Sequence, residues 1–200
     1  MNAPADGKLG RPGLQPKGVA RRREILDRAI DVFRERGSDG TSLRRIAEAL
    51  GVSHAALLHY FDSREQLLVA VYAHAEEQRA ASSPSTSTGV DSLVEAAVEN
   101  VEVPGLVQLY TTLLAASLEA GSTVGKEHFS TRFARLRASL TADFEADQRA
   151  GRIRTDVPAA DIAALLIAAS DGLQIQWLLE PSVGLEQTLR SFATLLQPAP

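Results

Sequence analysis

Apolar residues recur three and four positions apart along most of the chain, which is the spacing of helices that bury one face. Glycine, proline and serine mark most of the breaks between these segments. No run of residues alternates convincingly between apolar and polar, so the sequence predicts an all-α protein. The predicted helices cover residues 20–36, about 42–50, 53–60, 63–81, 90–101, 104–120, 126–150, 158–180 and 184–196.

Residues 43–60, LRRIAEALGVSHAALLHY, have the pattern of a helix-turn-helix. Apolar side chains occupy the places where two short helices pack together, and small residues occupy the closest approach and the turn. Ordinary helical hairpins in a core share parts of this pattern, but seven positions agree here, which favours DNA binding. The seven positions are Ile46, Ala47, Leu50, Gly51, Val52, Leu57 and Tyr60.

The second helix of this motif presents a short outward face. The hydroxyl of Ser53 is placed to cap its first turn. The residues that then project outward, as a recognition helix in a major groove requires, are His54, Ala55, Ala56, Leu58 and His59.

Charge is divided unevenly along the chain, although the net charge is only −4. Residues 8–64 contain twelve Lys and Arg against seven Asp and Glu, whereas residues 81–200 contain eight against fourteen. A basic N-terminal part attracts phosphate and an acidic remainder repels it. This division orients an approach to DNA.

Composition excludes several kinds of site and indicates where the protein acts. The chain has no cysteine, which excludes thiolate nucleophiles and thiolate zinc sites, and we expect neither a metal nor a cofactor. The N-terminus lacks the apolar stretch of a signal peptide, and the longest apolar run, 162–169, is short for a membrane span. A soluble cytoplasmic protein is therefore expected.

We predict three parts along the chain. Residues 1–18 are rich in Gly, Pro and Ala with interspersed basic residues, and indicate a flexible basic arm. Residues 19–79 form the DNA-binding domain, in which three helices build the helix-turn-helix and its support. Residues 80–200 form a C-terminal helical domain for ligand binding and dimerisation, and a Ser- and Thr-rich joint at 82–89 lies at its start.

The segment 19–79 resembles the N-terminal domain of TetR-family (tetracycline repressor type) transcriptional regulators. The resemblance is carried by the patterns ILxxAxxxFxxxG, IAxxxGVS and HYFxSxExL in combination. It implies a homodimer whose recognition helices read two half-sites of a palindromic operator in double-stranded DNA. The DNA-contacting residues that it implies are Ser42, Arg44, Arg45, Ser53, His54, Ala55, Ala56, His59, Tyr60 and Arg64.

Two positions depart from the family pattern. Leu58 stands where the family usually has a tyrosine that grips phosphate, so this anchor is missing or moved to Tyr60. Arg64 stands where the family prefers lysine, and the arginine keeps the positive charge at this position.

The C-terminal half resembles the family less specifically, mainly in residues 151–181. Small and apolar residues form a stripe on the helix 158–180. We expect this stripe, together with the helix 184–196, to be half of a four-helix dimer interface. The stripe consists of Ala164, Ala168, Gly172, Ile175 and Leu179. Packing within one subunit remains the alternative. The adjacent face, which includes Leu165, is expected to point inward and to help enclose a cavity for a small amphipathic effector. The expected effector contacts are Tyr110, Leu114, His128, Phe129, Phe133, Leu173, Gln176 and Trp177.

Two other functions compete with a ligand-released repressor. An enzyme is disfavoured, because His74 and His128 have no recognisable metal or triad spacing with acidic neighbours. A DNA-binding activator or architectural protein without small-molecule control shares every N-terminal feature, and only the bundle distinguishes it.

Overall fold

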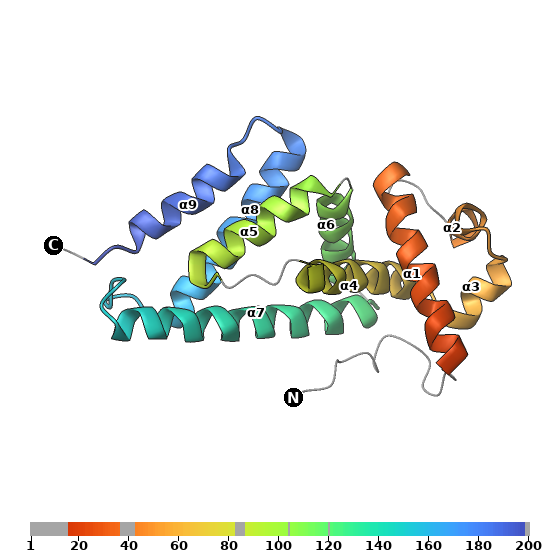
Figure 1. Cartoon of the computed structure of the whole chain (residues 1–200), viewed down its shortest axis with the longest axis horizontal. Helices are drawn as coiled ribbons and strands as arrows, with labels where there is room; N and C mark the ends of the chain where they lie inside the picture. Colours follow the sequence, from red (N-terminus) through yellow and green to blue (C-terminus); the bar gives the residue numbers. More distant parts are fainter. Residues whose placement is uncertain (1–15, 37–42, 83–86, 104, 120, 199–200) are drawn as a thin grey trace. The chain divides into compact units, whose positions relative to one another are not determined.

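The computed structural model describes residues 16–36, 43–82, 87–103, 105–119 and 121–198, without the side chains of residues 16, 33–36, 43, 45 and 82. Every regular element in these ranges is an α-helix, so the predicted all-α class is confirmed. Most of the basic arm, Ser42 and the side chain of Arg45 lie outside the described residues. The helices, coloured along the chain in Figure 1, are α1 (Pro16–Arg36), α2 (Leu43–Leu50), α3 (His54–Tyr60), α4 (Arg64–Ser82), α5 (Gly89–Glu102), α6 (Leu106–Ser117), α7 (Val124–Arg149), α8 (Ala159–Leu179) and α9 (Leu185–Leu195).

The helix bounds lie within about three residues of the predicted ones except at the start of the first helix. It begins at Pro16 rather than near residue 20. A proline fits the first position of a helix, because its missing N–H has no partner there in any helix and its φ is already helical. The composition of residues 1–18 therefore concealed the start of α1.

The chain forms two compact units, and the first is discontinuous in sequence. Unit 1 contains Met1–Ser83 and Pro104–His128, and unit 2 contains Pro84–Val103 and Phe129–Pro200. α6 and the first turn of α7 thus pack with the N-terminal helices, whereas the rest of α7 packs with the C-terminal ones.

Unit 1 is built around α1 and α4. α1 packs against α2 and α4, α2 packs against α3, and α4 packs against α6 (Figure 1). Apolar side chains at helical spacing provide this core, as the sequence pattern predicts. The core residues include Ile25, Leu26, Ala29, Ile30, Ile46, Leu50, Leu57, Phe61, Leu67, Leu68 and Val71, each at most 5 % exposed.

A buried polar contact also joins α1 to α4. His74 is 6 % exposed, and its Nε2 lies 2.7 Å from Oδ1 of Asp27. The side-chain amide of Gln78 donates to the same Oδ1 at 2.6 Å. One carboxylate on α1 therefore serves two polar side chains on α4.

Unit 2 has its own hydrophobic core among α5, α7, α8 and α9. α5 packs against both α8 and α9, and these two helices pack against each other. α7 contributes Leu140 and Phe144 to this core. At the start of α5, Gly89 has φ +59 and donates its N–H to Asp143 of α7, and a Cβ there would meet the Phe144 ring at 3.2 Å. Close approach of these two helices therefore requires glycine.

α8 is apolar on both sides, but only one side is covered. Ile162, Ala163 and Leu166 are buried against the unit 2 core, whereas Leu165 and Leu179 on the opposite side are 60 % and 83 % exposed. By length and composition, α8 is the one helix in the described part of the chain that could cross a membrane, although the apolar run 162–169 is short. Its apolar length reflects two faces that are both hydrophobic.

Candidate DNA-binding surface

Gly51 makes the turn between α2 and α3. Its φ is +64, a left-handed conformation that other residues adopt only with strain. The N–H of Gly51 donates to the carbonyl of Glu48 at 3.1 Å, and the N–H of Val52 donates to the carbonyl of Ala47 at 2.9 Å. These two bonds form a Schellman ending, which closes α2 and fixes the direction in which the chain leaves it.

Ser53 starts α3 as the sequence predicts. Its backbone is extended, with φ −71 and ψ 149, and its hydroxyl accepts from the N–H of Ala56 at 3.0 Å. Leu57 then points inward and is fully buried, as is Phe61 directly after the helix. The guanidinium of Arg22 from α1 lies 5.0 Å from the centre of the Phe61 ring. α3 is thus held at both ends and along its inner face.

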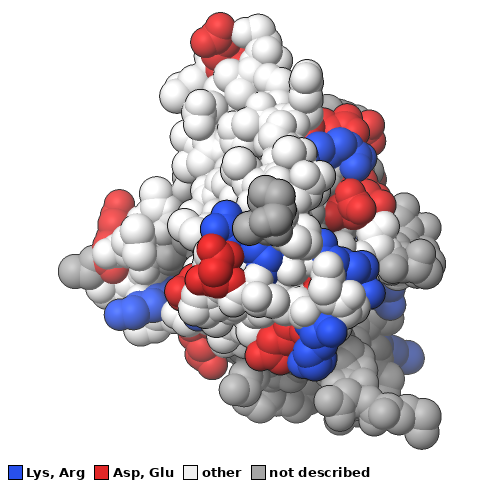
Figure 2. Space-filling model, turned by 90° about the vertical axis from the view of Figure 1, so that its left-hand side faces the viewer, with Lys and Arg blue, Asp and Glu red and all other residues white. Residues whose placement is uncertain are grey.

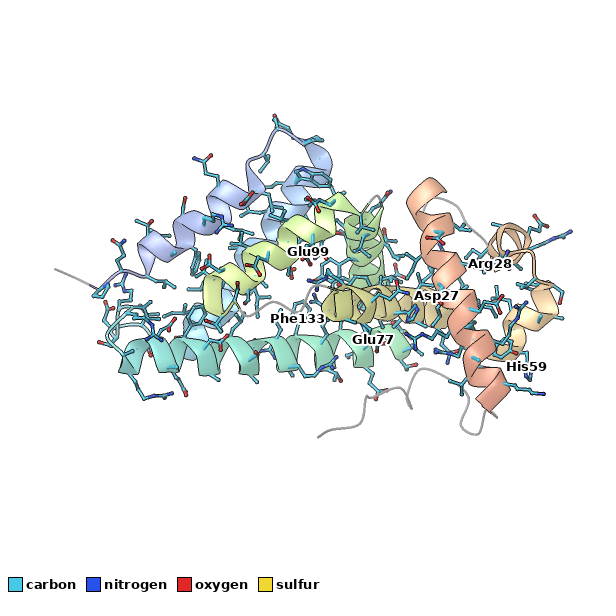
Figure 3. All side chains as sticks on the ribbon, in the orientation of Figure 1. Asp27, Arg28, His59, Glu77, Glu99 and Phe133 are labelled. Atoms are coloured by element: carbon cyan, nitrogen blue, oxygen red, sulfur yellow. The ribbon has the colours of Figure 1, made fainter. Side chains whose placement is uncertain are left out.

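The outer face of α3 is exposed among the described residues of unit 1. His54, Ala55, Leu58 and His59 are exposed, and Figure 3 marks the place of His59 on α3. Tyr60 is half-buried, and its ring meets the ring of His59 edge to face at a centroid distance of 5.0 Å. The predicted readout residues therefore share one accessible helix face, except that Ala56 is half-buried.

Two arginines flank this face. Arg64 is exposed in the first turn of α4, where unpaired backbone N–H groups and the helix dipole favour an anion. Arg44 is exposed on α2 and its Nε lies 3.3 Å from Oε1 of Glu48. Exposed pairs of this kind contribute about 0.3–0.5 kcal/mol, which a phosphate contact easily replaces.

The basic residues of α1 were not among the DNA contacts expected from the sequence, in which this helix was only a support. Lys17, Arg21, Arg23 and Arg28 are all exposed on it. Arg28, labelled in Figure 3, approaches the turn: its Nη2 lies 3.3 Å from where a Cβ on Gly51 would stand. The cluster of three arginines at 21–23 was the available signal, because such clusters attract phosphate.

Comparison with known proteins places this geometry in a family. Residues 25–71 match the description "Bacterial regulatory proteins, tetR family", and residues 122–197 match "BetI-type transcriptional repressor, C-terminal". The HTH-type transcriptional repressor Rv1474c of Mycobacterium tuberculosis is 32 % identical over 156 residues, which cover 78 % of this chain and 81 % of that protein. The chain belongs to the TetR family. It is a DNA-binding transcriptional regulator and not an enzyme.

Solved structures of TetR-family proteins share the fold. A TetR transcription regulator from Haloarcula marismortui superposes with a TM-score of 0.73 at 21 % identity, covering 89 % of this chain and 98 % of that one. A protein described as a transcriptional regulator from Saccharomonospora viridis, solved in complex with choline, gives 0.66 at 21 % identity, covering 88 % and 94 %. At these identities the likeness establishes the arrangement of helices alone.

In this TetR-family chain, the residues predicted to bind an effector fall into two groups. Tyr110, Leu114 and His128 lie in unit 1, and the other five lie in unit 2. In unit 1 the ring of Tyr72 stacks on that of Tyr110 at 5.5 Å between centroids and meets His128 edge-on at 6.2 Å. In unit 2, Phe133, Leu173 and Trp177 are half-buried against the core, and Phe129 is buried.

The predicted orientation of α8 was wrong at two positions. Leu165 and Gln176 were expected on the inward face, but both are exposed. The side chains that α8 directs into unit 2 include Leu166, Ile167 and Gln174. Because α8 is apolar on two faces, the spacing of its apolar residues could not show which face points into the unit 2 core. No cluster of three or more His, Cys, Asp or Glu suited to a metal occurs among the described side chains.

Proposed function

We propose that this regulator is a homodimeric repressor that binds a palindromic operator and is released by a small amphipathic molecule. The exposed outer face of α3, held by the Gly51 turn and the Ser53 cap, is the observation that carries DNA reading. Repression is supported by the relative Rv1474c, which is named a repressor. Its place of action would be the cytoplasm, where its DNA lies.

Base readout would come from α3, and phosphate contacts would come from the helices around it. His54 and His59 can donate to base acceptors, whereas Ala55 offers apolar surface to thymine methyl groups. Phosphate contacts from Ser42, Arg44, Arg45 and Arg64 would then fix the register on the duplex without adding sequence information directly.

The exposed side of α8 supports dimerisation. Leu165, Ala168, Gly172, Ile175 and Leu179 recur at alternating three- and four-residue steps, which is the spacing of a seam between paired helices. A Cβ on Gly172 would meet nothing within 4 Å, so a second helix has room to approach closely. In the upper part of Figure 2, near the α8–α9 connection of Figure 1, most of the visible surface carries no charged side chain. Leu195 of α9 adds a further exposed apolar residue, at 66 %.

Effector binding is proposed at the aromatic residues of the two units. The choline bound to the Saccharomonospora viridis protein shows that a protein of this fold holds a small organic cation. Aromatic rings attract such cations, and the stacked pair Tyr72 and Tyr110 lies beside a carboxylate, that of Glu76, which accepts from the Tyr72 hydroxyl at 3.0 Å. Trp177, the one tryptophan of the chain, provides a fluorescence signal in unit 2.

The DNA-binding proposal is tested by selecting bound duplexes from a random pool. We expect a palindrome whose half-sites are separated by about one helical turn or a multiple of it. His59→Ala should relax the preference at one position and cost about 1–3 kcal/mol there, whereas Arg64→Ala should weaken all sequences alike. Arg135→Ala, an exposed arginine of α7 in unit 2, is the matched control. A pool without any enriched sequence would contradict the proposal.

Repression and release are tested with the selected operator upstream of a reporter. Expression should fall when the protein is present and should recover with an effector. Choline and longer amphipathic amines are the first probes, ranked by their change in Trp177 fluorescence. Bound ligands that never alter operator affinity would refute release, because a ligand with equal affinity for both states shifts nothing. Higher expression in the presence of the protein would refute repression.

A further inference from the structure

Glu65, the acidic residue of the HYFxSxExL segment, has no role in the DNA surface described above. It lies in the first turn of α4, next to Arg64. Its carboxylate also contacts a segment outside its own helix. Oε1 accepts a hydrogen bond from the hydroxyl of Ser122 at 2.5 Å and another from the N–H of Gly125 at 3.0 Å. Both partners lie in unit 1.

The contact makes Glu65 a cap for a second helix. Gly125 is the second residue of α7, so its N–H is one of the first-turn donors that have no partner within their own helix. Glu65 supplies the missing acceptor from 60 residues away in the sequence. Its negative charge therefore lies at the N-termini of both α4 and α7, where both helix dipoles favour it.

The packing around Gly125 leaves this arrangement little freedom. A Cβ on Gly125 would lie 2.8 Å from Oε1 of Glu65 and 3.0 Å from Cβ of Ser117. Ser117 is buried at the end of α6, so it cannot move aside easily. The connection between α6 and α7 therefore packs so closely against the first turn of α4 that its backbone contacts the Glu65 side chain.

The opposite side of the same turn is fixed separately. Ser63 caps α4 by accepting from the N–H of Gln66 at 3.0 Å, and the Gln66 side chain accepts from the N–H of Asp62. These bonds are local, within four residues. The Glu65 contact instead ties the start of α4 to a segment about 60 residues further along the chain.

We propose that Glu65, held by Ser122 and Gly125, is a positioning residue that sets where Arg64 meets the DNA backbone. The α6–α7 connection thereby controls operator affinity through the start of α4. This inference rests on the proposed phosphate contact of Arg64. It adds a physical connection between that contact and a segment about 60 residues further along the chain.

The test measures operator affinity and its salt dependence in full-length variants. Ser122→Ala removes one donor to Glu65, and Glu65→Gln removes the charge; each should weaken operator binding about five- to tenfold. Each should also reduce the slope of log affinity against log salt by about one per subunit, as loss of a phosphate contact does. Ser139→Ala, an exposed serine further along α7, should change neither quantity.

A double-mutant cycle separates positioning from general stability. In an Arg64→Ala background, Ser122→Ala should have less than a twofold further effect, because the contact that it positions is already gone. Thermal unfolding of Ser122→Ala should stay close to that of the parent. Unchanged affinity, tighter binding, or an undiminished effect of Ser122→Ala in the Arg64→Ala background would each overturn the proposal. Failure of the parent protein to select any operator would instead refute the proposed function.

Discussion

At the scale of single residues, the motif depends on a few positions whose chemistry is local. Gly51 and Ser53 were recognised from sequence because a left-handed turn and a helix cap each favour particular residue types at a particular spacing. The structure confirms both, with φ +64 at Gly51 and a 3.0 Å cap at Ser53. Leu58 is the position where local chemistry departs from the family pattern, and it is 37 % exposed.

Replacing Gly51 by alanine tests the turn. A Cβ at φ +64 is strained, and it would also stand 3.3 Å from Nη2 of Arg28. We expect Gly51→Ala to lower the free energy of unfolding by about 1–2 kcal/mol, measured by urea denaturation. Gly184→Ala, where a Cβ meets nothing within 4 Å and φ is −72, is the matched control. Equal stability of the two variants would show that the turn tolerates a side chain.

Replacing Leu58 by tyrosine tests the missing phosphate anchor. The added hydroxyl can donate to a phosphate oxygen, which leucine cannot do. We expect Leu58→Tyr to tighten operator binding by about 0.5–1.5 kcal/mol. Titrations against the selected operator and a scrambled duplex measure this change. Because phosphate contacts carry no sequence information, both duplexes should gain alike. A gain confined to the operator would indicate base contact instead.

At the scale of helices, the sequence predicted where each helix lies, but it did not predict how the helices contact one another. Periodicity located the helices, but it placed Leu165 inward, because α8 is apolar on both faces. The contacts of Asp27 with His74 and of Glu65 with Gly125 join residues 47 and 60 positions apart. Such contacts depend on how helices pack, and no spacing rule within one helix encodes them.

Removing the Asp27 carboxylate tests the polar contact between α1 and α4. Asp27→Ala would leave the buried His74 and the side-chain amide of Gln78 without this acceptor. A lost partner of a buried polar group costs about 1–3 kcal/mol, so the urea midpoint should fall accordingly. Glu77→Ala, which removes an exposed carboxylate of α4 that is also labelled in Figure 3, should have little effect. Identical midpoints for the two variants would contradict the role assigned to Asp27.

At the scale of the whole molecule, the main feature is the apolar face of α8 that remains exposed to solvent in a single chain. Unit 2 buries a hydrophobic core of its own, to which α8 contributes one face. The same helix nevertheless exposes large apolar side chains to solvent, which a single soluble chain rarely does over a continuous strip. Which of two apolar faces is covered by the chain itself depends on the packing of α5 and α9, and the sequence alone does not encode that choice.

Placing a charge on this face tests dimerisation. Leu179→Glu would bury a carboxylate if two α8 helices pair, so the dimer should dissociate at micromolar concentration in size-exclusion chromatography with light scattering. Leu118→Glu is a matched control, since Leu118 is equally exposed, at 82 % against 83 %, but lies in unit 1. A parent protein that is already monomeric, or a Leu179→Glu variant that stays dimeric, would rule out the α8 interface.

The uncovered side of α8 also affects how operator occupancy depends on the number of regulator molecules. If one copy reads only half of an operator, the occupied fraction rises with the square of subunit concentration wherever subunits are mostly unpaired and operators are mostly unoccupied. Halving the number of molecules per cell would then cut occupancy about fourfold rather than twofold in that range. The strength of contact along one hydrophobic strip would therefore set how sharply the controlled genes respond to the abundance of their own regulator.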